Sequence, residues 1–203
     1  MKFIDLQNKL QELKIFNIRD LEIIDANFNK SKISSWNKKW YIKNLRKWYY
    51  IFWNLNITQS LLYFIANKLY INSYISLEFA LNYYWIIPEQ SFVITSVSNK
   101  KTINFETFIW NFSYKKIKSC LFWWYNIINI NNNKILIWDL EKVILDYFYL
   151  NKVDNIEDLK WLRWNKDILL EKIDFKKIKK YSKKYNSKII NDRVNNLFHY
   201  LWK

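Results

Sequence analysis

The residues between Asn27 and Phe52 carry the clearest chemical signal in the chain. This segment holds seven Lys and Arg residues and no Asp or Glu. Such a stretch can neutralise phosphates, and each phosphate contact makes binding weaker at higher salt because condensed counterions are released. The residues that we expect to contact a polyanion are Lys30, Ser31, Lys32, Ser34, Ser35, Asn37, Lys38, Lys39, Lys43, Arg46 and Lys47.

Two other interpretations compete with phosphate binding. A charge run often forms only a solvated face, but the complete lack of acidic residues argues against that here. Aromatic residues interleaved with basic ones can also stack on the bases of a single strand. Tyr41, Tyr49, Tyr50 and Phe52 fall in a predicted hairpin, however, and alternation there favours the core for most of them.

The order of the predicted elements indicates how the basic residues are presented. Apolar residues at helical spacing predict a first helix over residues 2–14. Asn17, with Asp20 three residues on, fits the start of a second helix. A third helix is expected over 30–39, followed by strands over 41–45 and 49–52. Three helices and a hairpin in this order are the layout of a winged helix-turn-helix.

A helix-turn-helix places its recognition helix in the major groove of double-stranded DNA, with the N-terminal residues against base edges. Here these are residues 30–35, with Asn37 and Lys38 further along. Arg46 and Lys47 fall at the expected wing tip, where they would reach phosphates or the minor groove. Contacts of that kind add affinity without reading sequence.

The rest of the chain mixes helical and strand patterns. Helices are expected over 59–70, 76–84 and 139–150, strands over 92–97, 102–108 and 135–137, and helices again over 157–203. The polar residues 98–101 indicate a hairpin between the first two of these strands. We therefore expect an α+β protein in three parts: a winged helix-turn-helix over 1–54, an α+β domain over 55–152 and a basic helical region over 153–203.

The net charge of +15 favours a polyanionic partner over an acidic small substrate. Both ends of the chain are basic and the middle is nearly neutral. The lysine-rich segment 174–188 could contact a partner protein, RNA or further DNA, or simply face solvent. No apolar run approaches the roughly 18 residues of a membrane span, residues 1–13 do not resemble a signal peptide, and a single Cys excludes internal disulfides. We expect a cytoplasmic protein.

The residues that could perform catalysis are few. His199 is the sole histidine and falls in a predicted helix, whereas Cys120 sits in an apolar run typical of an inert small hydrophobe. Glu141 and Asp146 are five residues apart on one helix and so do not face each other well. No phosphate-binding glycine motif is present. We expect no enzyme activity, no cofactor and no metal site.

The chain contains no glycine and twelve tryptophans. Tight turns with positive φ depend on glycine, and several tryptophans stand where glycine is expected. Trp48 falls in the predicted hairpin turn, whereas Trp40 and Trp85 follow predicted helices at the position that favours a C′ glycine. Our hypothesis is that most tryptophans here are encoded by UGA and are glycine in the source organism, with Trp36 and Trp123 the least suited to that exchange. An AT-rich genome would explain the excess of Asn, Ile and Lys, but not the absence of Gly.

Several segments resemble AbiEi-type antitoxins of type IV toxin–antitoxin (abortive infection) systems. Residues 36–52, WNKKWYIKNLRKWYYIF, are close to the family pattern RWQKKGYIxxLRRGYYxF, and residues 66–89 are similar to IANxxYxPSYISLESALSYYGLIPE. Residues 95–97, 105–107 and 112–114 also resemble the family, as do residues 141–146, which match its PEKALLD motif. The family glycines fall on Trp40, Trp48 and Trp85.

The resemblance implies a DNA-binding antitoxin that represses transcription of its own operon through the winged helix. It also implies that the C-terminal region counteracts a nucleotidyltransferase-like toxin, with or without direct contact between the two proteins. Leu140 replaces a family proline and Ser35 replaces an arginine, so the individual base contacts do not carry over. The alternative is a stand-alone winged-helix transcriptional regulator without a toxin partner.

Overall fold

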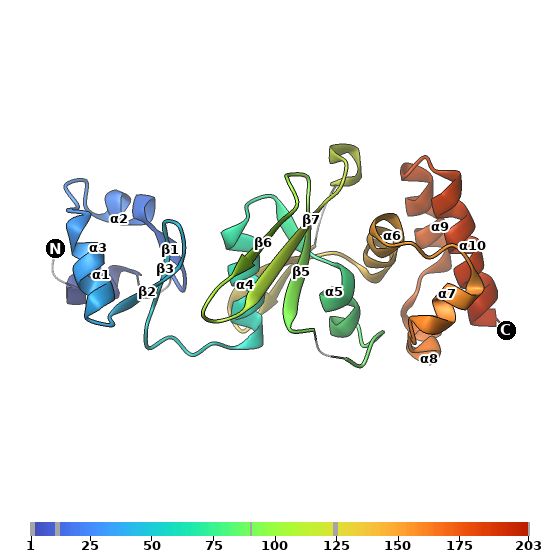
Figure 1. Cartoon of the computed structure of the whole chain (residues 1–203), viewed down its shortest axis with the longest axis horizontal. Helices are drawn as coiled ribbons and strands as arrows, with labels where there is room; N and C mark the ends of the chain where they lie inside the picture. The colour runs from blue at the N-terminus through green and yellow to red at the C-terminus, as the bar shows by residue number, and fades with distance from the viewer. Residues whose placement is uncertain (1–2, 11–12, 90, 124–125, 203) are drawn as a thin grey trace.

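The computed structural model describes residues 3–10, 13–89, 91–123 and 126–202. Figure 1 shows an elongated molecule with the N-terminal elements at one end, a sheet in the middle and helices α7 to α10 at the other end. The fold is mixed α+β, as expected. No helix in these described ranges is both long and apolar enough to cross a membrane.

The N-terminal unit contains three helices and a small antiparallel sheet of order β1-β3-β2. It has a hydrophobic core of its own, formed by residues between Leu6 and Phe52. The predicted capping box is confirmed, because the Asn17 side chain accepts from the Asp20 N–H while Asp20 accepts from the Asn17 N–H. The elements are α1 (Phe3–Leu10), β1 (Phe16–Asn17), α2 (Ile18–Ile24), α3 (Ser31–Lys38), β2 (Ile42–Arg46) and β3 (Tyr49–Phe52).

The middle of the chain forms a six-stranded mixed sheet of order β6-β7-β5-β4-β9-β8. The predicted hairpin between β5 and β6 is wrong: β7 lies between them, parallel to β5 and antiparallel to β6. The elements are α4 (Gln59–Leu69), β4 (Ser73–Ile75), α5 (Leu77–Tyr83), β5 (Val93–Ser98), β6 (Ile103–Glu106), β7 (Asn111–Lys116), the 3-10 helix η1 (Ser119–Leu121), β8 (Asn126–Ile130) and β9 (Asn133–Ile137).

A side chain replaces part of the ladder between β4 and β9, which pair only at Ile75 and Ile137. The Asn67 side chain on α4 accepts from the Leu136 N–H at 2.9 Å and donates to the carbonyl oxygens of Leu136 and Ser73. Asn67 therefore satisfies backbone groups that a continuous β4–β9 ladder would otherwise pair.

The C-terminal helices pack on the same hydrophobic core as the sheet, which runs from Leu61 to Leu201 and also takes in Ile15, Leu45 and Ile51. Short breaks divide the predicted helical region into separate helices. These helices are α7 (Ile156–Trp161), α8 (Lys166–Lys172), α9 (Phe175–Lys184) and α10 (Lys188–Trp202), and they follow α6 (Leu140–Leu150).

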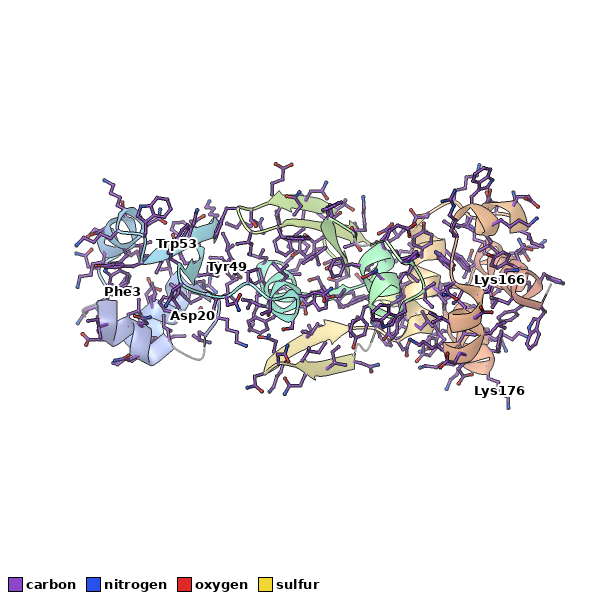
Figure 2. All side chains as sticks on the ribbon, turned by 90° about the horizontal axis from the view of Figure 1, so that it is seen from below. Phe3, Asp20, Tyr49, Trp53, Lys166 and Lys176 are labelled. Carbon is purple, nitrogen blue, oxygen red and sulfur yellow. The ribbon has the colours of Figure 1, made fainter. Side chains whose placement is uncertain are left out.

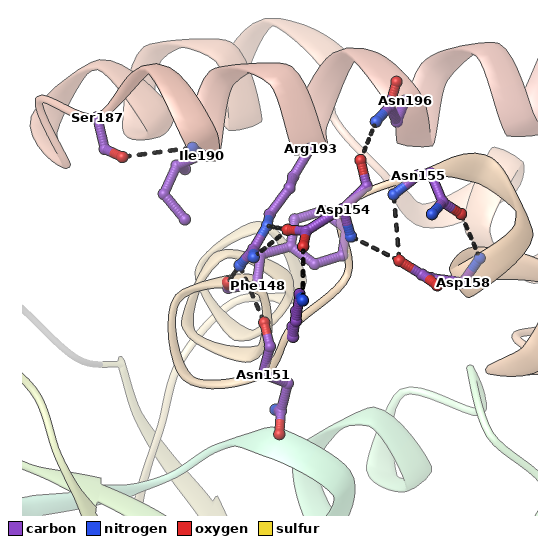
Figure 3. A network of polar contacts seen from close by, with 10 residues as sticks. Phe148, Asn151, Asp154, Asn155, Asp158, Ser187, Ile190, Arg193 and Asn196 are labelled. Carbon is purple, nitrogen blue, oxygen red and sulfur yellow. Dashed lines mark hydrogen bonds and ion pairs between the residues drawn. The ribbon is translucent and has the colours of Figure 1, made fainter.

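An arginine joins α10 to the end of α6 (Figure 3). The Arg193 guanidinium donates to the Phe148 carbonyl and to the Asn151 carbonyl, the latter at 2.9 Å. It also pairs with the Asp154 carboxylate. The backbone carbonyl of Asp154 accepts from the Asn196 side chain. These contacts satisfy carbonyl groups that α6 leaves unpaired at its C-terminus.

A buried ion pair links the sheet to the C-terminal helices. Lys142 and Asp146 lie one turn apart on α6 and both are fully buried. The Asp146 carboxylate accepts from the hydroxyls of Tyr74 at 2.8 Å, Ser76 at 3.1 Å and Tyr185 at 2.9 Å. Burial raises the pKa of both tyrosines and lowers that of Lys142, although Asp146 opposes the shift of the lysine.

Candidate nucleic-acid interface

Helix α3 begins after an asparagine that organises its first turn. The Asn29 side chain accepts from the Ser31 N–H at 3.0 Å and from the Ser31 hydroxyl at 2.7 Å. Lys30 stands at the N-cap position without a side-chain cap of its own. Its ammonium group forms an exposed ion pair with Glu22 and lies at the end of the helix where the backbone dipole favours anions.

The two faces of α3 differ in chemistry. Ile33 and Trp36 are buried in the N-terminal core, whereas Lys32 is half-buried. The exposed predicted residues on and next to the helix are Lys30, Ser31, Ser34, Ser35, Asn37, Lys38 and Lys39. The structure therefore brings most of the predicted residues onto one solvent-facing surface.

A groove of about 370 Å³ separates α3 from the β2–β3 hairpin. Lys30, Ser34 and Asn37 line its helix side, and Asn44 and Trp48 line its hairpin side. Ile18, Ile33 and Tyr50 complete the lining, and no carboxylate takes part. The groove presents hydrogen-bonding groups and a positive charge over an apolar base.

A second hollow of about 430 Å³ continues beyond Lys30 toward the hairpin turn. Arg19, Lys30 and Lys47 all line it. Glu22 also lines it and forms an exposed ion pair with Lys30 at 2.8 Å. An anion entering this hollow would therefore compete with Glu22 for Lys30.

Sequence reasoning missed Arg19 and Asn44. Arg19 lies before the acid-free segment, on the first turn of α2, and only the fold brings it near Lys47. Strand alternation would place Asn44 on the same face as the buried Ile42 of β2, so it gave no signal for the exposure of Asn44, and the register of the hairpin shifts between Asn44 and Arg46.

Arg46 corrects the prediction for the wing tip, because its side chain does not join this surface. Its guanidinium lies 3.4 Å from the centre of the Phe105 ring and donates to the Leu69 carbonyl at 3.3 Å. Both contacts belong to the middle of the chain. Arg46 thus ties the hairpin to the larger sheet, and of the two basic residues predicted at the turn only Lys47 is exposed.

Lys43 is also held by other side chains. Its ammonium group lies 4.3 Å from the Phe108 ring centre, 4.5 Å from that of Trp53 and 5.2 Å from that of Trp40. Such cation–π contacts are each worth about 0.5–2 kcal/mol. Lys43 therefore contributes charge near the surface but is less free to reach a phosphate than Lys38 or Lys39.

Three tryptophans occupy backbone positions that favour glycine, as the sequence predicted. The φ angles are 57° at Trp40, 71° at Trp48 and 66° at Trp85. A bulky residue with positive φ is a genuine outlier. All three side chains are exposed, so burial of the rings does not account for their presence.

Trp40 and Trp85 occupy the same position in equivalent helix ends. After α3, Tyr41 N–H donates to the Trp36 carbonyl and Trp40 N–H to the Asn37 carbonyl. After α5, the N–H groups of Ile86 and Trp85 donate to the carbonyls of Leu81 and Asn82 in the same pattern. This is the Schellman motif, whose C′ residue is usually glycine.

Trp36 and Trp123 behave differently, as expected. Trp36 lies in the core against Phe3 and Phe28, and Trp123 packs against Trp138 and the Tyr185 ring. Both are ordinary environments for an indole ring.

The other candidate reactive residues do not form a site. Cys120 is exposed, contrary to the expectation of an apolar environment, and His199 is exposed on α10. Within the described ranges, no group of three or more His, Cys, Asp or Glu side chains could hold a metal ion.

No protein-family model matches the chain, and no curated protein shows significant similarity to it.

Proposed function

We propose that the N-terminal unit is a winged helix that binds double-stranded DNA, with α3 as the recognition helix and the β2–β3 hairpin as the wing. The observation that carries this proposal is the acid-free groove between α3 and the hairpin, which Lys30 lines, together with the exposed Lys38 and Lys39 at the C-terminal end of α3. The order of helices and strands in the unit also agrees with this fold.

The side chains divide between two kinds of contact. Ser31, Ser34 and Asn37 present hydroxyl and amide groups that can pair with base edges in the major groove. Phosphates are contacted by the basic residues around them, which position the protein without reading sequence. The proposed phosphate-binding residues are Arg19, Lys30, Lys38, Lys39 and Lys47.

The proposal extends to the biological role. The resemblance of residues 36–146 to AbiEi-type antitoxins supports an antitoxin that represses its own operon and counteracts a nucleotidyltransferase-like toxin. A gene for such a toxin beside the coding sequence would support this role. An isolated gene, without a neighbouring nucleotidyltransferase-like gene, would leave a DNA-binding regulator and contradict the antitoxin assignment.

DNA binding is tested by the salt dependence of affinity for the DNA upstream of the gene. The variant Lys38→Ala/Lys39→Ala should bind more weakly, and the slope of log K against log[salt] should flatten by about 0.9 for each phosphate that is no longer neutralised. Lys115→Ala/Lys116→Ala removes two equally exposed adjacent charges from β7 and serves as the control. Equal slopes for both variants would show that Lys38 and Lys39 merely face solvent.

A further inference from the structure

The hairpin formed by β8 and β9 ends in a free strand edge. Strand β8 is the last strand of the larger sheet and, among the described residues, pairs only with β9. Figure 2 shows the pale yellow hairpin set apart from the other strands. A free edge of this kind offers unpaired N–H and C=O groups to another chain.

The register of the hairpin shows which groups point outward. Asn131 and Asn132 have φ angles of 50° and 60° and form a two-residue turn, which makes Ile130 and Asn133 a hydrogen-bonded pair. Hydrogen-bonded and non-bonded pairs alternate along an antiparallel ladder. The backbone groups of Ile127 and Asn129 therefore point away from β9.

An independent contact agrees with this register. Leu136, which lies opposite Ile127, directs its N–H and C=O toward Asn67 on α4 rather than toward β8. The pair Ile127–Leu136 is accordingly a non-bonded pair, and the outward groups of Ile127 meet nothing within the described chain.

The edge lacks the features that usually discourage pairing. β8 contains only Asn and Ile, in a chain of net charge +15, and the Ile127 side chain is 63% exposed. The opposite edge strand, β6, ends at Glu106 and follows the exposed residues Lys100 and Lys101. Charged residues are the common protection of an edge, and β8 has none.

The sequence of β8 fits a second copy of itself. If two copies pair in antiparallel fashion with Ile128 opposite Ile128, then Ile127 of one copy lies opposite Asn129 of the other. This register matches every outward N–H with an outward C=O. It also places the two Ile128 side chains on one face and opposes no like charges.

We propose that β8 is a homodimerisation edge, through which two chains join their sheets across a two-fold axis centred on Ile128. Pairing uses the free edge of both copies and therefore closes at the dimer. The hairpin tip also contacts the N-terminal part of the chain, because Lys14 donates to the Asn133 side chain at 2.6 Å. Dimerisation does not depend on DNA binding, and the two proposals fail separately.

Sedimentation equilibrium of the full chain tests the proposal. The wild-type protein should show a monomer–dimer equilibrium, and Ile127→Lys should raise its dissociation constant by at least about tenfold because the two added charges lie on the same sheet face, diagonally across the two-fold axis. Ile189→Lys, which replaces an isoleucine of similar exposure (60%) on α10, should leave the constant unchanged. A monomeric wild-type protein, or equal constants for the two variants, would overturn the proposal.

Cross-linking tests the register without relying on a disruptive variant. In a Cys120→Ser background, Ile128→Cys should form an intermolecular disulfide on oxidation, because facing non-bonded residues lie within disulfide reach. Asn126→Cys should not, since its symmetry mate would be about 13 Å away along the strands. Equal cross-linking at both positions would contradict the two-fold axis at Ile128.

Discussion

Helices α3 and α9 are both rich in lysine, yet the structure uses their charges differently. Lys38 and Lys39 at the C-terminal end of α3 are exposed, and the groove on this helix contains no carboxylate. On α9, Lys177 forms ion pairs with Asp139 at 2.9 Å and Glu141 at 3.2 Å, and Lys184 lies over the Trp123 ring. Part of the charge on α9 therefore holds the helix to α6. Lysines that pair with carboxylates across a helix contact are less available to a polyanion than unpaired ones.

The contact between α9 and α6 is reinforced by the buried Lys142–Asp146 pair, which Tyr185 joins from the end of α9. The N-terminal unit shows no comparable buried pair among its described residues, and apolar and aromatic contacts fill its core. The two regions should therefore respond very differently to the loss of a single charge.

Asp146→Ala should have the largest effect on stability. The variant leaves the Lys142 ammonium group buried without its carboxylate, a change that costs about 3–5 kcal/mol of the free energy of unfolding. Urea denaturation measures it. Asp192→Ala, which removes an exposed carboxylate from α10, should change the free energy by less than about 0.5 kcal/mol.

The loss should become smaller at alkaline pH. Burial lowers the pKa of Lys142, and Asp146 opposes that shift in the wild-type protein. Without Asp146, the folded pKa falls further below that of the unfolded chain, so the unfolded state binds more protons between the two values. The stability of the variant then rises with pH through that window. A loss that is independent of pH would contradict an ionised Lys142 as its cause.

Trp40→Gly, Trp48→Gly and Trp85→Gly should each stabilise the protein by about 1 kcal/mol, because each relieves a positive φ. Trp161→Gly is the matched control. Trp161 is also exposed but ends α7 without a positive φ, so glycine there should destabilise by about 0.5–1 kcal/mol. Thermal or urea unfolding compares them.

The coding DNA decides the origin of these residues: UGA codons at these positions agree with recoding, and UGG codons contradict it.

Local signals predicted much of the fold. Asn17 and Asp20 located the start of α2, and strands β2 and β3 agree with the predicted ranges within about a residue. The positions of Trp40, Trp48 and Trp85 were recognised because turn geometry depends on a few adjacent residues. The exposed surface of α3 followed from helical spacing in the same way.

Contacts between distant segments could not be predicted from these signals. The parallel pairing of β5 with β7 depends on a partner outside the local pattern, and strand β8 was not among the predicted strands. Arg46 was expected at the wing tip, but whether it faces DNA or the sheet depends on where Phe105 lies. A signal was present for the buried pair: Lys142 and Asp146 are the only charged residues after Glu141 on an otherwise apolar helix, and they are four residues apart.

The smallest expected change in stability comes from replacing Lys177, and it tests the difference between α3 and α9 most directly. Lys177→Met should lower the free energy of unfolding by about 0.5 kcal/mol, a modest value because the lysine side chain is partly exposed. Lys180→Met removes an exposed charge from the same helix and should leave stability unchanged. Urea denaturation measures both variants.

The same two variants also show whether α9 takes part in DNA binding. Since Lys177 is engaged by Asp139 and Glu141, its removal should leave the salt slope of DNA affinity unchanged. An unchanged slope for Lys180→Met as well would restrict the DNA interface to the N-terminal unit. A flatter slope for Lys180→Met alone would mean that the outward lysines of α9 contact DNA and that only the inward ones are structural. The contrast between a DNA-binding and a structural use of lysine would then lie between the two faces of α9 rather than between α3 and α9.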